Sequence, residues 1–270
     1  MTQRLRSLLF VPGNRPDLAA KAPRSAPDGV VLDLEDAVPP GDKADARAAM
    51  ADVVGPLSAE VPVYVRINPP GTPWCAGDMA TLTAGIAGVV VPKLESTSQL
   101  IEVSGSIGAA GIVAGLETVR GVMDARDVLR PPVTACYFGA EDYVYDLGGV
   151  RTGDNAEVAS PRALVAAAAR LGGVTALDMV TLNFRDAGRF EREAREARAL
   201  GYAGKLCIHP AQVALANAAF LPTDQEIERA RKLLAAFAAA GGATIAFEGQ
   251  MVDEVVAARA RAVLGAVDGS

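Results

Sequence analysis

Ionisable side chains lie at or just after the ends of most of the short apolar runs in this sequence. They are Glu35 and Asp36, Arg66, Lys93, Glu117, Glu141 and Asp142, and His209. If the runs end at one place in the fold, these opposite charges meet there, and a metal ion or a charged substrate is expected among them. Carboxylates without clusters of histidine or cysteine prefer hard cations, so the metal to expect is Mg²⁺ or Mn²⁺. The competing interpretation is that these residues belong to solvated loops and cap helices.

Spacing alone does not select the metal ligands, since Glu35, Asp36, Glu117, Glu141 and Asp142 all qualify. Neighbouring residues on an extended chain point to opposite sides, so one member of each adjacent pair is expected to face the metal. Zinc is not expected, because the chain has one histidine and no closely spaced pair of cysteines.

Eight apolar runs are expected to be the strands that position these residues. The runs are Leu8–Val11, Val30–Leu34, Val61–Ile67, Val89–Val91, Ile112–Leu116, Thr134–Phe138, Ala176–Leu182 and Lys205–Ile208. Their continuous apolar character is typical of strands buried on both faces of a parallel sheet. With helical stretches between them they fit an α/β fold, a (β/α)8 TIM barrel, whose active-site groups lie at the carboxyl ends of the strands. A doubly wound open sheet is the main alternative, but no GxGxxG motif follows the first run.

Helix signals divide the chain into a core and an extension. Ser160–Pro161 predicts an N-cap serine with proline at the first helical position. Residues 223–226 form a capping-box pattern, Thr-Asp-Gln-Glu, that opens another helix. We expect residues 1–221 to form the TIM barrel core and residues 222–270 to form a C-terminal helical extension, jointed at Gly249 and ending in a last helix.

The composition excludes several classes of protein. The 270 residues include 26 Lys and Arg against 32 Asp and Glu, a net charge of −6. No nucleic acid partner is expected, because binding the phosphate backbone requires a basic face. No membrane association is expected, because no apolar run approaches the ~18 residues of a membrane span, and Leu8–Val11 is too short for the core of a signal peptide. The three scattered cysteines indicate a reduced, cytoplasmic protein.

Eight short motifs, in order along the chain, carry a resemblance to a known family. They are Phe10–Asn14, Leu32–Asp36, Arg66–Asn68, Pro92–Lys93, Glu117–Thr118, Phe138–Asp142, Cys207–Pro210 and Phe247–Asp253. In these motifs the sequence resembles the citrate lyase β-subunit-like family, which includes the malyl-CoA and citramalyl-CoA lyases and belongs with the HpcH/HpaI aldolases. The resemblance covers nearly the whole chain.

The resemblance implies a TIM barrel that assembles as a homotrimer or hexamer and performs a Mg²⁺-dependent retro-aldol reaction. The substrate would be a 3-hydroxyacyl-CoA such as citramalyl-CoA, malyl-CoA or citryl-CoA, and the products acetyl-CoA or propionyl-CoA and a 2-oxo acid. By resemblance, Glu117 and Asp142 are the metal ligands. Arg66 matches the arginine that grips the 2-oxo acid carboxylate. Glu35 and Asp36 match acidic residues near the metal, where they would hold its waters or orient Arg66.

Other matched positions concern the thioester and the proton transfer. Backbone N–H groups near Glu141 would bind the other end of the carboxylate. Lys21 and the backbone of Ile208 and His209 fall where relatives contact coenzyme A. Asp253 matches an aspartate that a neighbouring subunit delivers over the site as general acid or base. From the residues alone, Asp253 would instead cap the last helix, and His209 would simply end a strand.

Three other functions stay open at this point. The chain could be the β subunit of a citrate lyase complex whose thioester is held by an acyl-carrier protein, or an acyl-CoA thioesterase of the same family. It could also be a non-catalytic oligomeric binding protein that kept the barrel. The identity of the 2-oxo acid (glyoxylate, pyruvate or oxaloacetate) is open as well.

Overall fold

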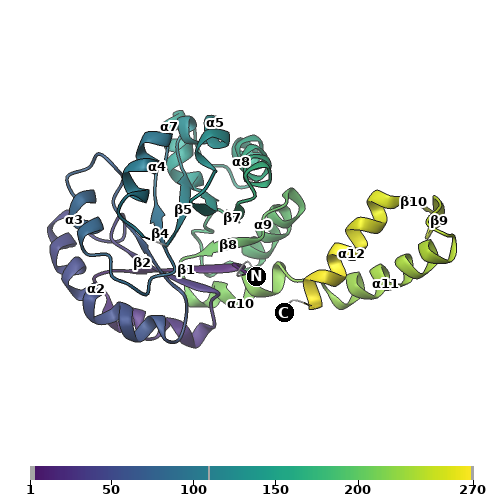
Figure 1. The fold of residues 1–270 in the computed structure, drawn as a ribbon, viewed down its shortest axis with the longest axis horizontal. Helices are drawn as coiled ribbons and strands as arrows, with labels where there is room; N and C mark the ends of the chain where they lie inside the picture. The colour runs from purple at the N-terminus through teal and green to yellow at the C-terminus, as the bar shows by residue number, and fades with distance from the viewer. Residues whose placement is uncertain (1–3, 109, 269–270) are drawn as a thin grey trace. The chain divides into compact units, whose positions relative to one another are not determined.

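Eight parallel strands close into a barrel that helices surround (Figure 1). The computed structural model describes residues 4–108 and 110–268. The strands are β1 (Ser7–Pro12), β2 (Gly29–Asp33), β3 (Val63–Arg66), β4 (Gly88–Val91), β5 (Gly111–Leu116), β6 (Val133–Phe138), β7 (Thr175–Asp178) and β8 (Gly204–Cys207). Each pairs in parallel with the next, and β8 pairs with β1. The predicted (β/α)8 TIM barrel and its eight strands are confirmed.

The helices of the barrel follow the strands in sequence. They are α1 (Pro16–Ala19), α2 (Lys43–Ser58), α3 (Cys75–Ala80), α4 (Thr97–Ser104), α5 (Val119–Met123), α6 (Ala125–Val128), α7 (Ala140–Leu147), α8 (Ala159–Gly172), α9 (Ala187–Leu200) and α10 (Pro210–Ala219). Among the described residues, no helix combines the length and the apolar character that crossing a membrane requires.

The barrel interior is filled by side chains from every strand. Its buried cluster contains Leu5, Leu8, Val31, Tyr64, Val90, Val113, Ala135, Tyr137, Leu177 and Leu206. Helices cover the outer face of the same strands, so almost every strand residue is buried. The continuous apolar runs of the sequence have this origin.

The barrel closes where β8 meets β1. Leu9 pairs with Cys207 in this seam. A Cβ atom on Gly204 would collide with the carbonyl oxygen of Leu5, just before β1. The close approach of these two backbone segments therefore requires a residue without a side chain at position 204.

A buried ionic network joins β7 and β8 to the helices outside them. Lys205, fully buried on β8, donates to Asp178 Oδ2 at 2.7 Å and lies 3.4 Å from Glu193 Oε2 on α9. Arg162 on α8 donates to both oxygens of Asp178, at 3.1 and 3.2 Å. Burial alone would raise the pKa of Glu193, but Lys205 and several hydrogen bonds lower it to about 2. These buried charges are therefore paired, as burial requires.

The prediction that the seventh strand extends to Leu182 is wrong, because β7 ends at Asp178. Beyond that point the carbonyl of Met179 accepts a hydrogen bond from Lys205 Nζ at 2.7 Å, and the carbonyl of Thr181 accepts one from Gln212 Nε2 at 2.9 Å. Side chains therefore replace the neighbouring strand as partners of this backbone.

The start predicted for the helix at Ser160–Pro161 is also displaced. A 3₁₀ turn, Ala156–Val158, leads directly into α8, which begins at Ala159 with Val158 at the N-cap position. The proline therefore stands in the first turn, where the backbone N–H groups need no helical partner.

The C-terminal part forms a compact unit of its own, Ala219–Ser270, distinct from Met1–Ala218. It contains α11 (Asp224–Ala239), a hairpin of β9 (Ile245–Phe247) and β10 (Gln250–Val252), and α12 (Glu254–Asp268). Its core is Ala230, Leu233, Phe237, Val252, Ala257 and Ala260. Residues 269–270 lie outside the described residues.

The predicted capping box of α11 is confirmed. The Thr223 hydroxyl accepts a hydrogen bond from the backbone N–H of Glu226 at 3.2 Å, and the Glu226 carboxylate accepts one from the Thr223 N–H at 2.7 Å. The prediction that Gly249 is a joint between two helices is wrong, because this residue belongs to the turn of the hairpin between β9 and β10. Glu248 and Gly249 have φ angles of 49° and 75°, the left-handed pair that a tight hairpin turn requires.

Candidate active site

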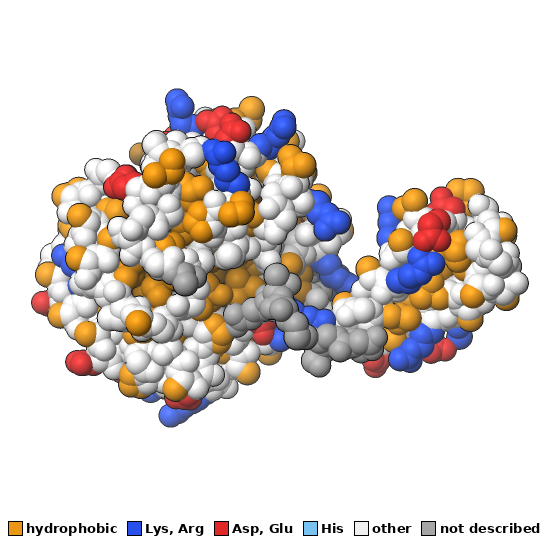
Figure 2. Space-filling model, in the orientation of Figure 1, with side chains coloured by type: hydrophobic (Ala, Val, Ile, Leu, Met, Phe, Trp, Pro, Cys, Tyr) orange, Lys and Arg blue, Asp and Glu red, His pale blue; other side chains and the backbone are white. Residues whose placement is uncertain are grey.

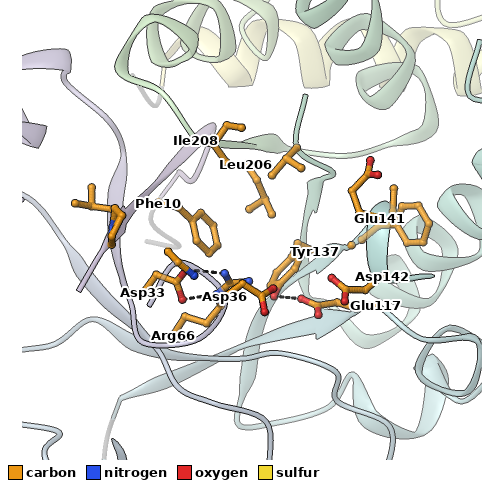
Figure 3. Close-up of a pocket in the computed structure, with 17 residues that line it drawn as sticks. Phe10, Asp33, Asp36, Arg66, Glu117, Tyr137, Glu141, Asp142, Leu206 and Ile208 are labelled. Atoms are coloured by element: carbon orange, nitrogen blue, oxygen red, sulfur yellow. Dashed lines mark hydrogen bonds and ion pairs between the residues drawn. The ribbon is translucent and has the colours of Figure 1, made fainter. Parts of the chain in front are cut away.

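A cavity of about 410 Å³ lies at the carboxyl ends of the barrel strands. Its lining includes Phe10, Val11, Pro12, Asp33, Asp36, Arg66, Glu117, Tyr137, Gly139, Glu141, Asp142, Leu206 and Ile208. Figure 3 shows these side chains converging from several strands on one space. This is where a barrel places its active site. Five residues singled out in the sequence for binding a metal or the substrate line it: Asp36, Arg66, Glu117, Glu141 and Asp142.

The guanidinium of Arg66 is paired with two carboxylates, those of Asp33 and Glu35. Its Nε and Nη2 donate to the two oxygens of Asp33 at 2.8 and 2.6 Å, and its Nη1 lies 3.0 Å from Glu35 Oε2. The ring of Phe10 covers the guanidinium at 5.0 Å. Asp33 uses two of the five N–H groups of the guanidinium. Of the remaining three, one is on Nη2 and two are on Nη1, which also contacts Glu35. These are the N–H groups that could bind a carboxylate in the cavity.

Lys93 stands among three carboxylates. Its Nζ lies 2.8 Å from Glu35 Oε1, 3.3 Å from Asp142 Oδ1 and 3.8 Å from Glu117 Oε2. Its φ of 50° is in the left-handed region, which is uncommon for a residue other than glycine and is characteristic of functional sites. Burial alone would lower the pKa of Lys93, but the three carboxylates raise it, so the ammonium stays charged.

Two of the three carboxylates around Lys93, those of Glu117 and Asp142, also line the cavity. Glu117 is 2% exposed, and burial raises its pKa. Its Oε1 accepts a hydrogen bond from the Tyr137 hydroxyl, whereas its buried Oε2 has no hydrogen-bond partner. An unpaired buried carboxylate oxygen is costly unless a cation meets it.

The donor set fits a hard divalent cation. Mg²⁺ commonly uses one or two protein carboxylates and takes its other ligands from substrate and water. Within residues 4–108 and 110–268 there is no group of three or more His, Cys, Asp or Glu side chains arranged for a metal. Glu117 and Asp142, which both lie near Lys93 Nζ, are two carboxylates that could hold such an ion.

The members of each adjacent acidic pair contact different partners, although Glu141 and Asp142 both line the cavity. Asp142 faces Lys93, whereas Glu141 accepts a hydrogen bond from Arg151 Nε at 2.8 Å. Both belong to α7, so helical spacing rather than an extended chain separates them. Glu35 is buried against Lys93 and Arg66, whereas Asp36 is exposed and lines the cavity.

A second cavity, of about 320 Å³, contains the positions matched to coenzyme A binding. It is lined by Leu9, Phe10, Val11, Pro12, Leu18, Lys21, Ala22, Ile208, His209 and Pro210. Phe10, Val11, Pro12 and Ile208 line the first cavity too. The two spaces therefore share a wall.

The backbone of Ile208 and His209 is already partly used. Both N–H groups donate to Gln212 Oε1, at 2.8 and 3.2 Å. The His209 ring stacks on Phe184 at 4.5 Å, and its Nδ1 accepts a hydrogen bond from the N–H of Ala211. The carbonyl oxygen of His209 also accepts a hydrogen bond from the N–H of Gln212 at 3.0 Å, so the polar backbone of this turn is largely engaged within the chain.

Asp253 belongs to the C-terminal unit. Its Oδ1 accepts a hydrogen bond from the backbone N–H of Val256 at 3.0 Å, so its carboxylate caps α12. Capping is the role that the residue type alone indicates. Its role in proton transfer stays a prediction.

Residues 6–210 match the sequence profile of the HpcH/HpaI aldolase/citrate lyase family. The chain belongs to this family. It is 51% identical to a citrate lyase subunit beta-like protein of Deinococcus radiodurans, over 96% of each chain. It is 31% identical to a (3S)-malyl-CoA thioesterase of Cereibacter sphaeroides, over 96% of this chain and 93% of the other.

Two solved structures from Mycobacterium tuberculosis are also similar to this member of the family. One is protein CitE in complex with magnesium, acetoacetate and coenzyme A, with a TM-score of 0.88 and 35% identity, covering 98% of this chain and 99% of that one. The other is a citrate lyase beta subunit complexed with oxaloacetate and magnesium, with a TM-score of 0.73 and 36% identity, covering 81% of this chain and 98% of that one.

Sequence reasoning on this family member missed two side chains of the cavity, Asp33 and Tyr137. Asp33 stands in the Leu32–Asp36 motif, but its place opposite Arg66 follows from strand pairing. Tyr137 lies inside an apolar strand and resembles an ordinary core residue. The one signal for it in the sequence is a polar hydroxyl within an otherwise apolar run that ends at the site. Lys93, which follows the fourth apolar run, pairs with the carboxylates of the site.

Proposed function

We propose that this protein is a Mg²⁺-dependent carbon–carbon lyase acting on a 3-hydroxyacyl-CoA. It would cleave citramalyl-CoA, malyl-CoA or citryl-CoA into an acyl-CoA and a 2-oxo acid, or condense these products in reverse. The observation that carries the proposal is one cavity that presents a guanidinium beside two carboxylates suited to a hard cation. A second cavity shares a wall with it and contains Lys21.

Arg66 is proposed to bind the carboxylate of the 2-oxo acid. A guanidinium binds a carboxylate through two parallel hydrogen bonds, which fixes both its position and its plane. Asp33 and Glu35 hold the guanidinium in place, so little side-chain freedom remains to be lost when the substrate binds. Backbone N–H groups near Glu141 would contact the other end of the same carboxylate.

Glu117 and Asp142 would hold the magnesium ion, and Asp36 would hold its waters. When bound, the ion would lower the pKa of the substrate hydroxyl and polarise the carbonyl that forms from it. Support comes from the buried Oε2 of Glu117, which accepts no hydrogen bond, and from the magnesium in two similar structures. Lys93 and Glu35 would remain paired beside the ion.

The reaction breaks the bond between the carbon that carries the hydroxyl and the carbon next to the thioester. The hydroxyl loses its proton and its oxygen becomes the carbonyl of the 2-oxo acid. The electron pair of the broken bond moves to the thioester as an enolate, which must then be protonated on carbon. Asp253 is proposed to supply that proton, a contribution worth about 10²–10⁴-fold in rate. In the condensation direction it would remove the same proton.

The thioester end is proposed to lie in the second cavity, where coenzyme A would meet Lys21, Ile208 and His209. The exposed ammonium of Lys21 is suited to a phosphate, and the apolar wall of Phe10, Val11 and Pro12 to the pantetheine chain. The coenzyme A bound to the similar M. tuberculosis protein supports this assignment.

The C-terminal unit is proposed to close the site of a neighbouring subunit in a homotrimer or hexamer. Asp253 stands between two exposed apolar side chains, Met251 and Val255, which are 68% and 59% exposed. Figure 2 shows hydrophobic side chains on the face of this unit that is in view. An apolar surface around an acidic residue suits a lid that excludes water while it presents an acid.

A product assay with and without magnesium tests the proposal. The protein is incubated with each of the three 3-hydroxyacyl-CoA thioesters, and released 2-oxo acid and free thiol are both measured. A lyase gives 2-oxo acid and a shorter acyl-CoA without free thiol, and chelation by EDTA stops it. If no thioester yields a 2-oxo acid, or if EDTA has no effect, the proposal is wrong.

The second candidate is an acyl-CoA thioesterase, because a (3S)-malyl-CoA thioesterase is 31% identical over 96% of the chain. In the same assay this activity would release free coenzyme A thiol and intact malate, with no 2-oxo acid. The three cysteines are buried, so they add little background to a thiol assay. They form no disulfide, which supports the proposal of a reducing, cytoplasmic location.

A further inference from the structure

Tyr137 and Gly115 face each other in the barrel wall. They are register partners in the pairing of β5 with β6. Glu117 follows two residues after Gly115, and side chains two residues apart on a strand point to the same side. Tyr137 therefore lies beside Glu117 across a position that has no side chain.

The missing side chain lets the phenol reach Glu117. The hydroxyl of Tyr137 donates to Glu117 Oε1, as Figure 3 shows. A Cβ atom on Gly115 would lie 2.5 Å from the Tyr137 hydroxyl oxygen and 2.8 Å from Glu117 Oε1. Real Cβ atoms do not approach so closely, so any larger residue at 115 would push both groups away. The contact therefore depends on the glycine.

We propose that Tyr137 is a positioning residue for the metal site, acting through Glu117. By occupying Oε1, it directs Oε2 toward Lys93, 3.8 Å away, and toward the cavity. This inference rests on the proposed function, in which Glu117 is a magnesium ligand. Both side chains are 2% exposed, so the phenol and the carboxylate meet away from bulk solvent.

The physical effect is preorganisation. A glutamate side chain has three rotatable bonds, and a metal that binds it must hold one arrangement of them. A partner that already fixes the carboxylate lowers this cost and prevents Oε1 from competing for the ion. Partners of metal ligands typically contribute about 10–100-fold to metal affinity.

The test is metal binding by Tyr137→Phe in the absence of substrate. Mg²⁺ binding is measured by calorimetry, and Mn²⁺ binding by the loss of the free-ion electron spin resonance signal. The variant keeps the buried ring and loses only the hydroxyl. We expect about a tenfold larger dissociation constant for both ions.

Tyr202→Phe is the matched control. Tyr202 is also buried, and its hydroxyl donates to the carbonyl of Arg162 at 2.9 Å, in another part of the barrel unit. Both variants should lower thermal stability, since each loses one buried hydrogen bond. If Tyr202→Phe weakens metal binding as much as Tyr137→Phe does, the effect is general destabilisation and the proposal is overturned.

Gly115→Ala tests the same contact from the other side. It should displace the phenol and weaken metal binding to a similar degree, even if Tyr137→Phe folds poorly. Unchanged metal affinity in both variants overturns the positioning role. Glu117→Gln separates this failure from that of the proposed function. If Glu117→Gln weakens metal binding and the other two variants do not, only the role of Tyr137 is wrong. If Glu117→Gln also binds the metal like the wild type, the assignment of Glu117 as a metal ligand is wrong, and the positioning role of Tyr137 is wrong with it.

Discussion

Asp33 and Arg66 are register partners in neighbouring strands, and the carboxylate of one accepts hydrogen bonds from Nε and Nη2 of the other at 2.8 and 2.6 Å. The pair is 13% and 2% exposed at the side chains of Arg66 and Asp33. Strand pairing therefore determines which way the guanidinium points. Asp33 holds the Nε and Nη2 edge, and Nη1 also contacts Glu35, so the N–H groups left for a ligand are the second one of Nη2 and those of Nη1 that Glu35 does not use.

Replacing Arg66 with lysine should remove recognition of the 2-oxo acid. An ammonium group cannot reproduce the two parallel hydrogen bonds of the guanidinium. In the condensation direction, we expect the KM for the 2-oxo acid to rise by at least about tenfold, because a charge-assisted pair is worth roughly 1.5–3 kcal/mol. The KM for the acyl-CoA should change little.

Arg162→Lys is the control for this change, because Arg162 also makes a paired contact with an aspartate, outside the cavity. It should reduce stability and leave both KM values unaltered. If Arg66→Lys weakens both ligands equally, Arg66 maintains the shape of the cavity and does not bind the carboxylate.

Glu117→Gln and Asp142→Asn should each abolish magnesium-dependent turnover while the protein stays folded. Each exchange removes the negative charge that a hard cation requires and changes the side-chain volume very little. Activity is measured over a range of Mg²⁺ concentrations, and folding by circular dichroism. Glu95→Gln, the same exchange at a carboxylate outside the cavity lining, should retain activity. Normal turnover in either test variant contradicts the assignment.

Lys21→Ala should weaken binding of the coenzyme A thioester. Lys21 is exposed and lines the second cavity, so its contribution is that of a solvated charge, about two- to fivefold in KM. The effect should shrink as salt is added. Arg24→Ala removes an exposed basic charge three residues away and should have no effect. Equal effects of the two changes would mean that general charge, and not the cavity, attracts the thioester.

Mixing two inactive proteins should restore activity if Asp253 acts on a neighbouring subunit. Asp253→Asn lacks the proposed acid, and Glu117→Gln lacks the proposed metal site. In a mixed closed oligomer some sites would combine an intact Asp253 from one chain with an intact Glu117 from another. Subunit exchange is confirmed by mass spectrometry of differently tagged chains. Exchange without recovery of activity would place Asp253 in its own chain's site or outside catalysis.

Glu193 should make the barrel sensitive to acid. Its pKa is lowered to about 2 in the folded protein. A carboxylate with a lowered pKa stabilises the fold above its ordinary pKa, and this contribution is lost as the pH falls through the folded value. Glu193→Gln should therefore cost on the order of 2–3 kcal/mol at pH 7, and the difference from the wild type should shrink from about pH 5 to pH 2.

The measurement is urea unfolding followed by the fluorescence of Trp74. This is the only tryptophan of the chain, and it lies in the barrel unit, so it reports on the barrel. Glu191→Gln changes a surface carboxylate on the same helix, α9, and should leave stability unaltered at every pH. A constant difference for Glu193→Gln across this pH range would contradict the prediction.

The barrel could be predicted from the sequence because each strand is buried on both faces. Such strands are continuous apolar runs, and every one of the eight appears at the predicted place. The end predicted for the seventh strand was wrong, because hydropathy does not reveal where a side chain replaces a neighbouring strand as the partner of a backbone carbonyl, as Lys205 does at Met179. The hairpin of the C-terminal unit was missed because its two strands have three residues each, too few for a periodic pattern.

The site was only partly predictable, for a related reason. Carboxylates such as Glu117 and Asp142 stand out at strand ends, and the structure brings them together at Lys93. Their supports do not stand out. The pairing of Asp33 with Arg66 depends on the register between strands, and the contact of Tyr137 with Glu117 depends on a glycine in the adjoining strand. Both contacts join residues of different strands, so they can be recognised only when the pairing of the strands is known.

The seam between the first and the last strand has a consequence for how the protein gains its activity during synthesis. Phe10, from β1, and Leu206, from β8, line the same cavity although nearly the whole barrel sequence separates them. A nascent chain without its eighth strand lacks one wall of this cavity. A small-molecule ligand therefore meets a complete site only after β8 has paired with β1. Ligand binding then favours only the closed barrel, which makes the ligand a selective stabiliser of finished molecules over unfinished ones.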